Sequence, residues 1–178
     1  ASETPGVYAR ITTQDSGDAT DGVLRIGNSY NDAHFRLTLG YAKDDGFAER
    51  YDIKRAHTAQ LRVDYDASSN DIFQFQAGYN DGPRGINAED PTEFPEKVYD
   101  KTVDNQFQQI RWTHSLSNDE ELQLQYYHNS QKIKETSQYD LTASEAGIPL
   151  FLYTSPIQFS LFNSIETDRH EIEAQHTL

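Results

Sequence analysis

The sequence predicts an all-β fold built from antiparallel, up-and-down strands, and three observations lead to it. Apolar and polar residues alternate strictly in segment after segment, which indicates strands with one apolar and one polar face. Short connections rich in Asn, Asp and Ser join many of these segments, and such residues turn the chain readily. No segment has the period of a long amphipathic helix.

The predicted strands follow one another along the whole chain. A weaker strand lies near Val7–Thr13, and in the next, Val23–Tyr30, Leu24 and Ile26 oppose Arg25 and Gly27. The apolar faces of the later segments carry Phe35, Leu37, Leu39 and Tyr41; Leu61, Val63 and Tyr65; Phe73, Phe75, Ala77 and Tyr79; Ile110, Trp112, His114 and Leu116; Leu122, Leu124 and Tyr126; and Ile172, Ala174 and Leu178. The opposite faces are rich in Gln and Arg.

The connections between the strands alternate in length. Short turns are expected at Asn31–Ala33, Ala67–Asp71 and Ser117–Asp119. Longer connections are expected near residues 42–58, 80–104 and 129–168. Because alternate connections of an antiparallel meander lie at the same end, all short turns should lie at one end of the sheet and all long loops at the other.

Two architectures fit this pattern, a transmembrane barrel and a soluble β-sandwich. Predicted strands of about 9–11 residues suit a tilted membrane crossing. Short turns at one end and long loops at the other are typical of outer-membrane barrels. Aromatic residues at both ends of the apolar face suit two interfacial girdles. They are Tyr30, Tyr65 and Phe73 beside short turns, and Tyr41 and Tyr79 beside long loops. The sequence therefore favours an up-and-down transmembrane β-barrel, with the sandwich as the alternative.

Length and composition limit the classes of function. The chain has 178 residues, enough for one ordinary domain. Its 29 acidic and 15 basic residues give a net charge of −14, which disfavours binding to a nucleic-acid backbone because that binding needs clustered Lys and Arg. The absence of Cys removes disulfides, thiolate metal sites and cysteine nucleophiles. Because the chain also has no Met and begins without a signal peptide, we expect Ala1 to be either a processed end or the start of an excerpt.

Several segments resemble the barrel of TonB-dependent outer-membrane receptors of Gram-negative bacteria. The resemblance is one of pattern and covers most of the chain outside the loops. The segments that carry it are His34–Phe47, Leu61–Asp66, Asp71–Tyr79, Gln108–Ser117, Glu121–His128 and Thr167–Leu178. Barrels of this family have about 22 strands, whereas about eight are predicted here, and neither a plug domain nor a TonB-contacting segment is visible. The expectation is therefore a partial outer-membrane barrel, residues 1–178, with three extracellular loops and no plug.

The resemblance implies a function in active uptake and no enzymatic activity. A scarce ligand, most simply a ferric siderophore or a similar iron complex, would bind at the outer face, and the TonB system would act through the missing plug. Lipid and lipopolysaccharide are the other expected partners, and no resident cofactor is expected. Loop cations and aromatic rings suit anionic chelates, although the same residues could be solvated or contact lipopolysaccharide phosphates. The candidate ligand-binding residues are Arg50, Tyr51, Arg55, Arg84, Tyr99 and Lys101.

Other chemistry has weaker support in the sequence. Acidic loop residues could bind Ca²⁺ through their oxygen atoms, but without a recognisable ligand spacing; they are Asp44, Asp45, Asp81, Glu89 and Asp90. His114, His128, His170 and His176 lack metal-ligand spacing and are expected to be packing or interfacial residues. The run His128-Asn129-Ser130 raises an outer-membrane hydrolase as a minor alternative. A carbohydrate-directed sandwich module and a small structural or adhesive barrel also stay open.

Overall fold

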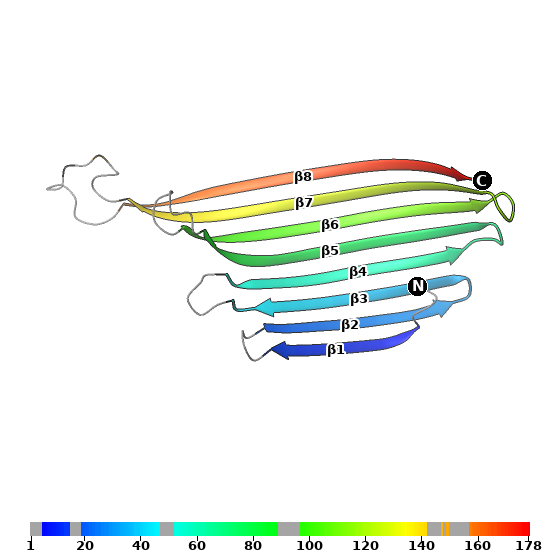
Figure 1. The fold of residues 1–178 in the computed structure, drawn as a ribbon, viewed down its shortest axis with the longest axis horizontal. Coiled ribbons are helices and arrows are strands. Elements are labelled where there is room, and N and C mark those ends of the chain that lie inside the picture. The colour runs from blue at the N-terminus through cyan, green and yellow to red at the C-terminus, as the bar shows by residue number, and fades with distance from the viewer. Residues whose placement is uncertain are drawn as a thin grey trace.

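The computed structural model is a single sheet of eight antiparallel strands in sequence order (Figure 1). It describes residues 5–14, 19–46, 52–88, 97–141, 147, 149 and 157–178. The strands are β1 Gly6–Gln14, β2 Ala19–Tyr30, β3 Ala33–Asp44, β4 Lys54–Asp66, β5 Asp71–Ala88, β6 Lys97–Ser115, β7 Glu121–Leu141 and β8 Ile157–Thr177. The predicted all-β, up-and-down fold is confirmed, including the weak first strand.

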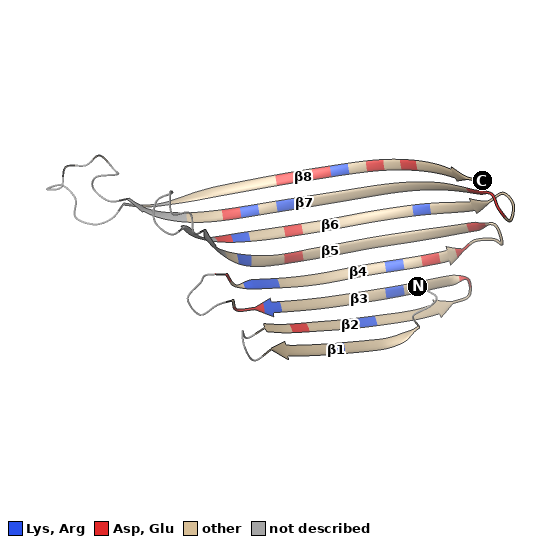
Figure 2. Cartoon of the chain, in the orientation of Figure 1, with Lys and Arg blue, Asp and Glu red and all other residues tan. Residues whose placement is uncertain are grey.

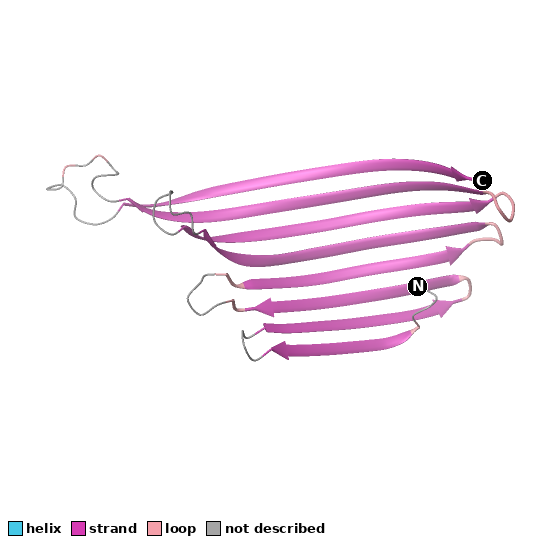
Figure 3. Ribbon diagram, in the orientation of Figure 1, coloured by secondary structure: helices cyan, strands magenta, loops and turns pink. Residues whose placement is uncertain are grey.

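The sheet is open, because β1 and β8 lie at its two ends and each is paired along one side among the described residues. The described elements are strands, turns and loops (Figure 3). Within the described part of the chain, no helix is long and apolar enough to cross a membrane. Since all eight strands share one sheet, they do not form the two stacked sheets of a β-sandwich, nor do they close on themselves as a small eight-stranded barrel.

The three predicted short turns, between β2 and β3, β4 and β5, and β6 and β7, lie at one end of the sheet (Figure 1). Between β2 and β3 the turn has two residues, and Asn31 adopts a left-handed φ of 50°, a conformation that Asn tolerates and tight hairpins require. In the next short turn, the backbone N–H of Ala67 donates to the carbonyl of Asp71 over 3.0 Å. The N–H of Leu116 donates likewise to the carbonyl of Glu120 over 2.9 Å in the third.

At the opposite end the strands extend further than their hydropathy predicts. The later strands, β5 to β8, have 18, 19, 21 and 21 residues, against the predicted 9–11. They therefore take up much of the ranges 80–104 and 129–168 that the sequence analysis assigned to loops, and β4 begins inside 42–58. The correction has a physical reason: beyond the apolar face, period-two hydropathy fades although the backbone ladder continues, as in the pairs Arg84↔Lys101 and Lys101↔Glu135.

Neither face of the sheet is covered by another layer of the described chain. No described side chain is fully buried, and among the described residues Asp64 is the only charged one that is buried. Large apolar side chains stay exposed on the apolar face, from Val7 at 73% on β1 to Ile172 at 76% on β8. A single sheet without a covered face leaves its apolar surface open to another medium or partner.

Candidate membrane-facing belt and ligand-binding site

The apolar residues of all eight strands form one continuous belt on one face of the sheet. Register places Leu24 opposite Leu39, Val63 opposite Phe75, and Trp112 opposite Leu124. Because residues paired across antiparallel strands share a face, these pairs join into a band from β1 to β8. On this face of β5 the charged residues Asp71 and Asp81 bracket the band, about 33 Å apart at ~3.3 Å per residue.

The belt crosses the strands obliquely. One row of paired residues is apolar at β1 but polar at β6 to β8, and it runs Val7, Ile26, Leu37, Leu61, Ala77, Gln108, His128 and His170. A row four residues nearer the short turns stays apolar to the far edge, from Tyr65 through Phe73, Trp112 and Leu124 to Ala174. On β1 the apolar residues centre on Ala9, whose row ends at Asp168 on β8, whereas on β8 they centre near Ala174. The centre of the belt thus moves by about six residues, roughly 20 Å along the strands against ~34 Å across them. The resulting angle is about 30°.

Aromatic residues follow both borders of the belt. Tyr65, Phe73 and Trp112 are paired in succession at the short-turn border. At the other border Tyr41 lies on β3 near its end, whereas Tyr79 lies in the middle of β5 and not beside a long loop as predicted, because β5 continues to Ala88. Tyr126 continues this border on β7, and its hydroxyl lies 2.9 Å from Nδ1 of His170. Each border therefore carries rings with an apolar body and a polar group that can reach a partner.

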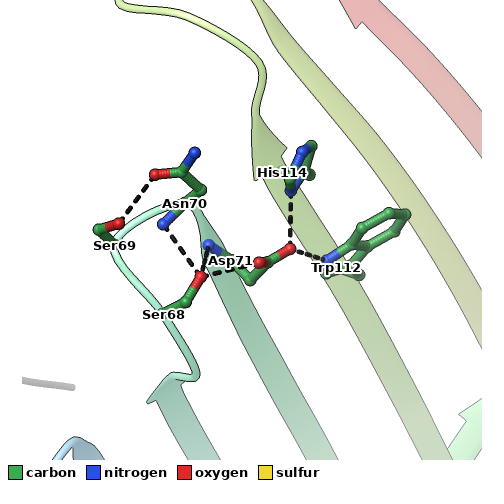
Figure 4. A network of polar contacts seen from close by, with 6 residues as sticks. All are labelled: Ser68, Ser69, Asn70, Asp71, Trp112 and His114. Atoms are coloured by element: carbon green, nitrogen blue, oxygen red, sulfur yellow. Dashed lines mark hydrogen bonds and ion pairs between the residues drawn. The ribbon is translucent and has the colours of Figure 1, made fainter.

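A polar network fixes the short-turn border around Asp71 (Figure 4). Its Oδ1 accepts a hydrogen bond from Trp112 Nε1 at 3.0 Å and lies 2.8 Å from His114 Nδ1, while Ser68 Oγ donates to Oδ2 at 2.8 Å. These hydrogen bonds, that of Ser68 first, hold the pKa of Asp71 below its usual range. The carboxylate thus links the turn to two rings of β6 and fixes the orientation of the indole.

The opposite, polar face carries amide and charged side chains at the level of the belt. Gln109 Nε2 and Arg111 Nε both donate to Oε1 of Gln125, at 2.8 and 2.9 Å. Arg62 Nε donates to Oδ1 of Asp64 at 2.9 Å. The face is therefore a hydrogen-bonding surface that suits water or a polar partner.

Two glycines of this face leave space that side chains of the neighbouring strands occupy. A Cβ at Gly78 would meet the ring of Phe107, its partner in register, and that ring stacks at 6.3 Å on Tyr127. A Cβ at Gly40 would meet the hydroxyl of Thr58. The space left by these two glycines is thus filled from within the sheet.

Toward the long-connection end, the polar face presents three cations side by side. Register places Lys54 opposite Arg84, and Arg84 opposite Lys101. We call these three residues the cation row. Figure 2 shows the basic residues near this end of β4, β5 and β6. Like charges directly opposite each other destabilise a sheet, and here they occur in a chain of net charge −14, so the row is a feature that packing alone does not explain.

The three cations differ in their partners. Lys101 Nζ lies 2.9 Å from Oε1 of Glu135, its neighbour in register. The hydrogen bond from this ammonium is the main reason that the pKa of Glu135 lies below its usual range. Lys54 and Arg84 are exposed, and neither side chain makes a hydrogen bond or ion pair with another residue that the structure describes, although Asp44 lies opposite Lys54 in register. Two cations of the row are therefore available to an anion.

The structure brings some of the predicted ligand-binding residues together and separates others. Arg84 and Lys101 are direct neighbours in the cation row. Tyr99 lies two positions before Lys101 on β6, opposite Ser137. Arg55 pairs with Lys43 on the apolar-belt side, just outside the belt. Arg50 and Tyr51 lie outside the described residues.

Sequence reasoning missed Lys54. It was assigned to a connection, so its face could not be read. The signal was the alternation itself: counted back from Leu61, the strand places Arg55 on the belt side and Lys54 on the polar side.

The predicted calcium ligands do not converge in the described part of the chain. Asp44 Oδ1 accepts the backbone N–H of Gly46 at 2.9 Å, Asp45 pairs with Lys43, and Asp81 Oδ1 lies 3.2 Å from His57 Nδ1. Glu89 and Asp90 lie outside the described residues. No group of three or more His, Cys, Asp or Glu side chains placed to hold a metal occurs among the residues described.

The histidines of β7 and β8 form a stacked pair just outside the belt. The rings of His128 and His170 have centroids 4.4 Å apart, and His128 Nε2 lies 3.3 Å from Oδ1 of Asp168. The hydrogen bond from Ser130, followed by that from His128, lowers the pKa of Asp168. In a hydrolytic triad the serine hydroxyl is hydrogen-bonded to the histidine. Here Asp168 lies between Ser130 and His128.

Comparisons of the chain with known protein families, with curated proteins and with solved structures found no match.

Proposed function

We propose that this sheet is part of the wall of a transmembrane β-barrel in a bacterial outer membrane, and that the barrel belongs to a TonB-dependent uptake receptor. The observation that carries the membrane part is the oblique, aromatic-bordered belt. Lipid-facing sheets need an apolar band about 25 Å tall, and closed barrels need strands tilted by about 35–45°. A belt at about 30° to the strand perpendicular follows a membrane plane across tilted strands.

The open edges of the sheet agree with a larger barrel. In hydrocarbon, unpaired backbone N–H and C=O groups have no water to bond, so exposed strand edges are not tolerated. If the belt meets lipid, β1 and β8 must pair with further strands. In that arrangement the polar face lines the lumen, and the long-connection end with the cation row is the outer mouth.

The cation row supports uptake of an anionic ligand, most simply a ferric chelate. Lys54 and Arg84 offer exposed donors on the lumen side, and guanidinium and ammonium groups bind carboxylate or similar anions through charge-assisted hydrogen bonds. Arg55 and Lys43, on the belt side, are instead placed to contact anionic lipid headgroups.

The membrane assignment is tested with the single tryptophan. Trp112 lies on the belt, so acyl chains carrying bromine should quench its fluorescence strongly in reconstituted vesicles. The matched control is Trp112→Phe combined with Thr113→Trp, which moves the probe by one residue to the polar face and should lose most of the quenching. Equal quenching of both proteins, or none of either, would contradict the assignment.

The transport role is tested separately in cells. Deletion of the gene should reduce uptake of radioactive iron from one or more anionic ferric chelates, and a proton uncoupler should abolish the same uptake in the parent strain. Uptake that is unchanged by deletion across a panel of such chelates would remove the receptor proposal while leaving the membrane assignment intact.

A further inference from the structure

The hydropathy of the two faces is exchanged beyond the belt. On the belt side most residues there are charged or polar, as in the ion pair of Lys132 and Glu166 at 3.1 Å, although Phe162 further along β8 is an exception. On the polar side, one row is aliphatic instead: Val103 pairs with Ile133, and Ile133 with Ile165. We call these three residues the aliphatic row. Ile165 is 50% exposed, so this apolar surface is uncovered by the described chain.

The aliphatic row adjoins the cation row. Val103 lies two residues from Lys101 on β6, about 7 Å along the same face. On β5, Gly82 is in register with Val103, and Ala56 lies at the same level on β4. No large side chain of this row therefore lies beside Lys54 and Arg84, where Gly82 is itself buried next to the backbone of Arg55 and Ala56, while the surface toward β8 is aliphatic.

We propose that this surface binds an amphipathic anion. Its negative group would lie against Lys54 and Arg84, and its apolar portion would lie on Val103, Ile133 and Ile165. The inference rests on the proposed receptor role and deepens it, because it names the class of ligand: an anionic compound, or chelate, with an aryl or alkyl portion on a scale of about 10 Å, the width of two strand spacings.

Charge and hydropathy together select this occupant. A small hydrated anion would use the cations but gain nothing from the aliphatic row. A neutral apolar compound would leave both unpaired cations unused. Only a ligand with both parts removes apolar surface from water and neutralises the adjacent like charges.

The experiment uses three small probes and the purified protein in lipid nanodiscs, with binding measured by calorimetry. Naphthalene-2-sulfonate carries both parts, methanesulfonate the charge alone and naphthalene-2-methanol the ring alone. We expect the first to bind at least about tenfold more tightly than either of the others, and its affinity to fall with added salt.

Substitutions then locate the site. Lys54→Gln and Arg84→Gln should each weaken naphthalene-2-sulfonate by about tenfold, the loss of one charge-assisted contact. Arg55→Gln, one residue from Lys54 and on the other face, is the control and should change nothing. Val103→Thr, which keeps side-chain size nearly constant, and Ile133→Val, which removes one carbon, should also weaken binding, whereas Lys134→Gln, beside Ile133 on the other face, should not.

Two results would overturn the inference. One is equal binding of methanesulfonate and naphthalene-2-sulfonate; the other is an effect of Arg55→Gln as large as that of Lys54→Gln. Trp112 quenching on the same preparation keeps the two proposals apart: quenched protein without selective binding removes the ligand class alone. If quenching fails, the same titration in detergent-free buffer still decides whether the site exists.

Discussion

At the scale of single residues, Gly82 shows what a side chain would disturb. A Cβ there would meet the carbonyl oxygen of Arg55 and lie 2.9 Å from the Cα of Ala56, both backbone atoms. The backbones of β4 and β5 therefore approach closely beside Pro83, which has no N–H to donate to the ladder. Because this point lies beside the cation row, the close approach also sets the positions of Lys54 and Arg84.

We expect Gly82→Ala to destabilise the protein by about 1–3 kcal/mol, since backbone cannot yield as a side-chain tip can. The control is Gly22→Ala, where the added Cβ would touch only the carbonyl oxygen of Tyr41, at 4.0 Å. That substitution should be neutral or slightly stabilising. Denaturant unfolding of both variants measures the difference, and equal stabilities would contradict the close approach of β4 and β5.

At the scale of the element, each strand places consecutive residues on opposite faces of the sheet. On β3, Leu37 lies between Ile26 and Leu61 in the belt, while Thr38 lies between Arg25 and Gln60 on the polar face. The strand period therefore decides which medium each residue contacts, independently of its place in the sequence.

If the belt meets the bilayer, Leu37→Arg should cost about 2–4 kcal/mol of folding free energy near the midplane. Thr38→Arg, the adjacent residue, should cost far less because it enters a polar surface that already holds Arg25. Unfolding from lipid vesicles by guanidinium compares the two. Similar costs at both positions would show that the two faces meet the same medium.

The strands were predictable from the sequence only where one face is apolar. Phe73, Phe75, Ala77 and Tyr79 mark β5 plainly, but beyond Asp81 the belt side turns polar and the period is lost. In β7, Ile133 continues the strand with its hydropathy on the other face, between Lys132 and Lys134, so the phase is reversed. Hydropathy could not show the extensions, because backbone pairing there does not depend on a single apolar face.

The candidate site was less predictable than the strands. Arg84 and Lys101 were chosen as loop cations, and their adjacency depends on a register across 17 residues that no local pattern states. Arg55 was chosen for the same reason as Arg84, yet it lies on the opposite face. Arg55 and Arg84 can be assigned to opposite faces only if their strands are known to include them. The sequence around residues 42–58 does not show that β4 begins at Lys54.

At the scale of the whole molecule, the belt predicts the orientation of the sheet if the sheet spans a membrane. Its angle of about 30° to the strand perpendicular implies strands tilted by about the same angle from the membrane normal. With 21 residues, β7 and β8 would then extend well beyond the hydrocarbon core on the long-connection side.

Polarised infrared spectra of oriented bilayers should therefore give a mean strand tilt of about 30–45° from the membrane normal. A sheet adsorbed flat on the bilayer surface would give strands close to perpendicular to the normal. That result would contradict a membrane-spanning wall even if Trp112 were quenched.

Because hydropathy is exchanged between the faces, the sheet has two zones, and the apolar side chains lie on a different face in each zone. Near the short turns the belt side is apolar and the other side is polar. Past Asp81 and Lys132 the belt side is mainly polar, and the aliphatic row lies on the other side. If the belt meets the bilayer, moving the sheet along its strands by a few residues would bring charged side chains of the belt side, such as Lys132 and Glu166, into hydrocarbon. Its depth in a bilayer is thereby set by the sequence of its strands.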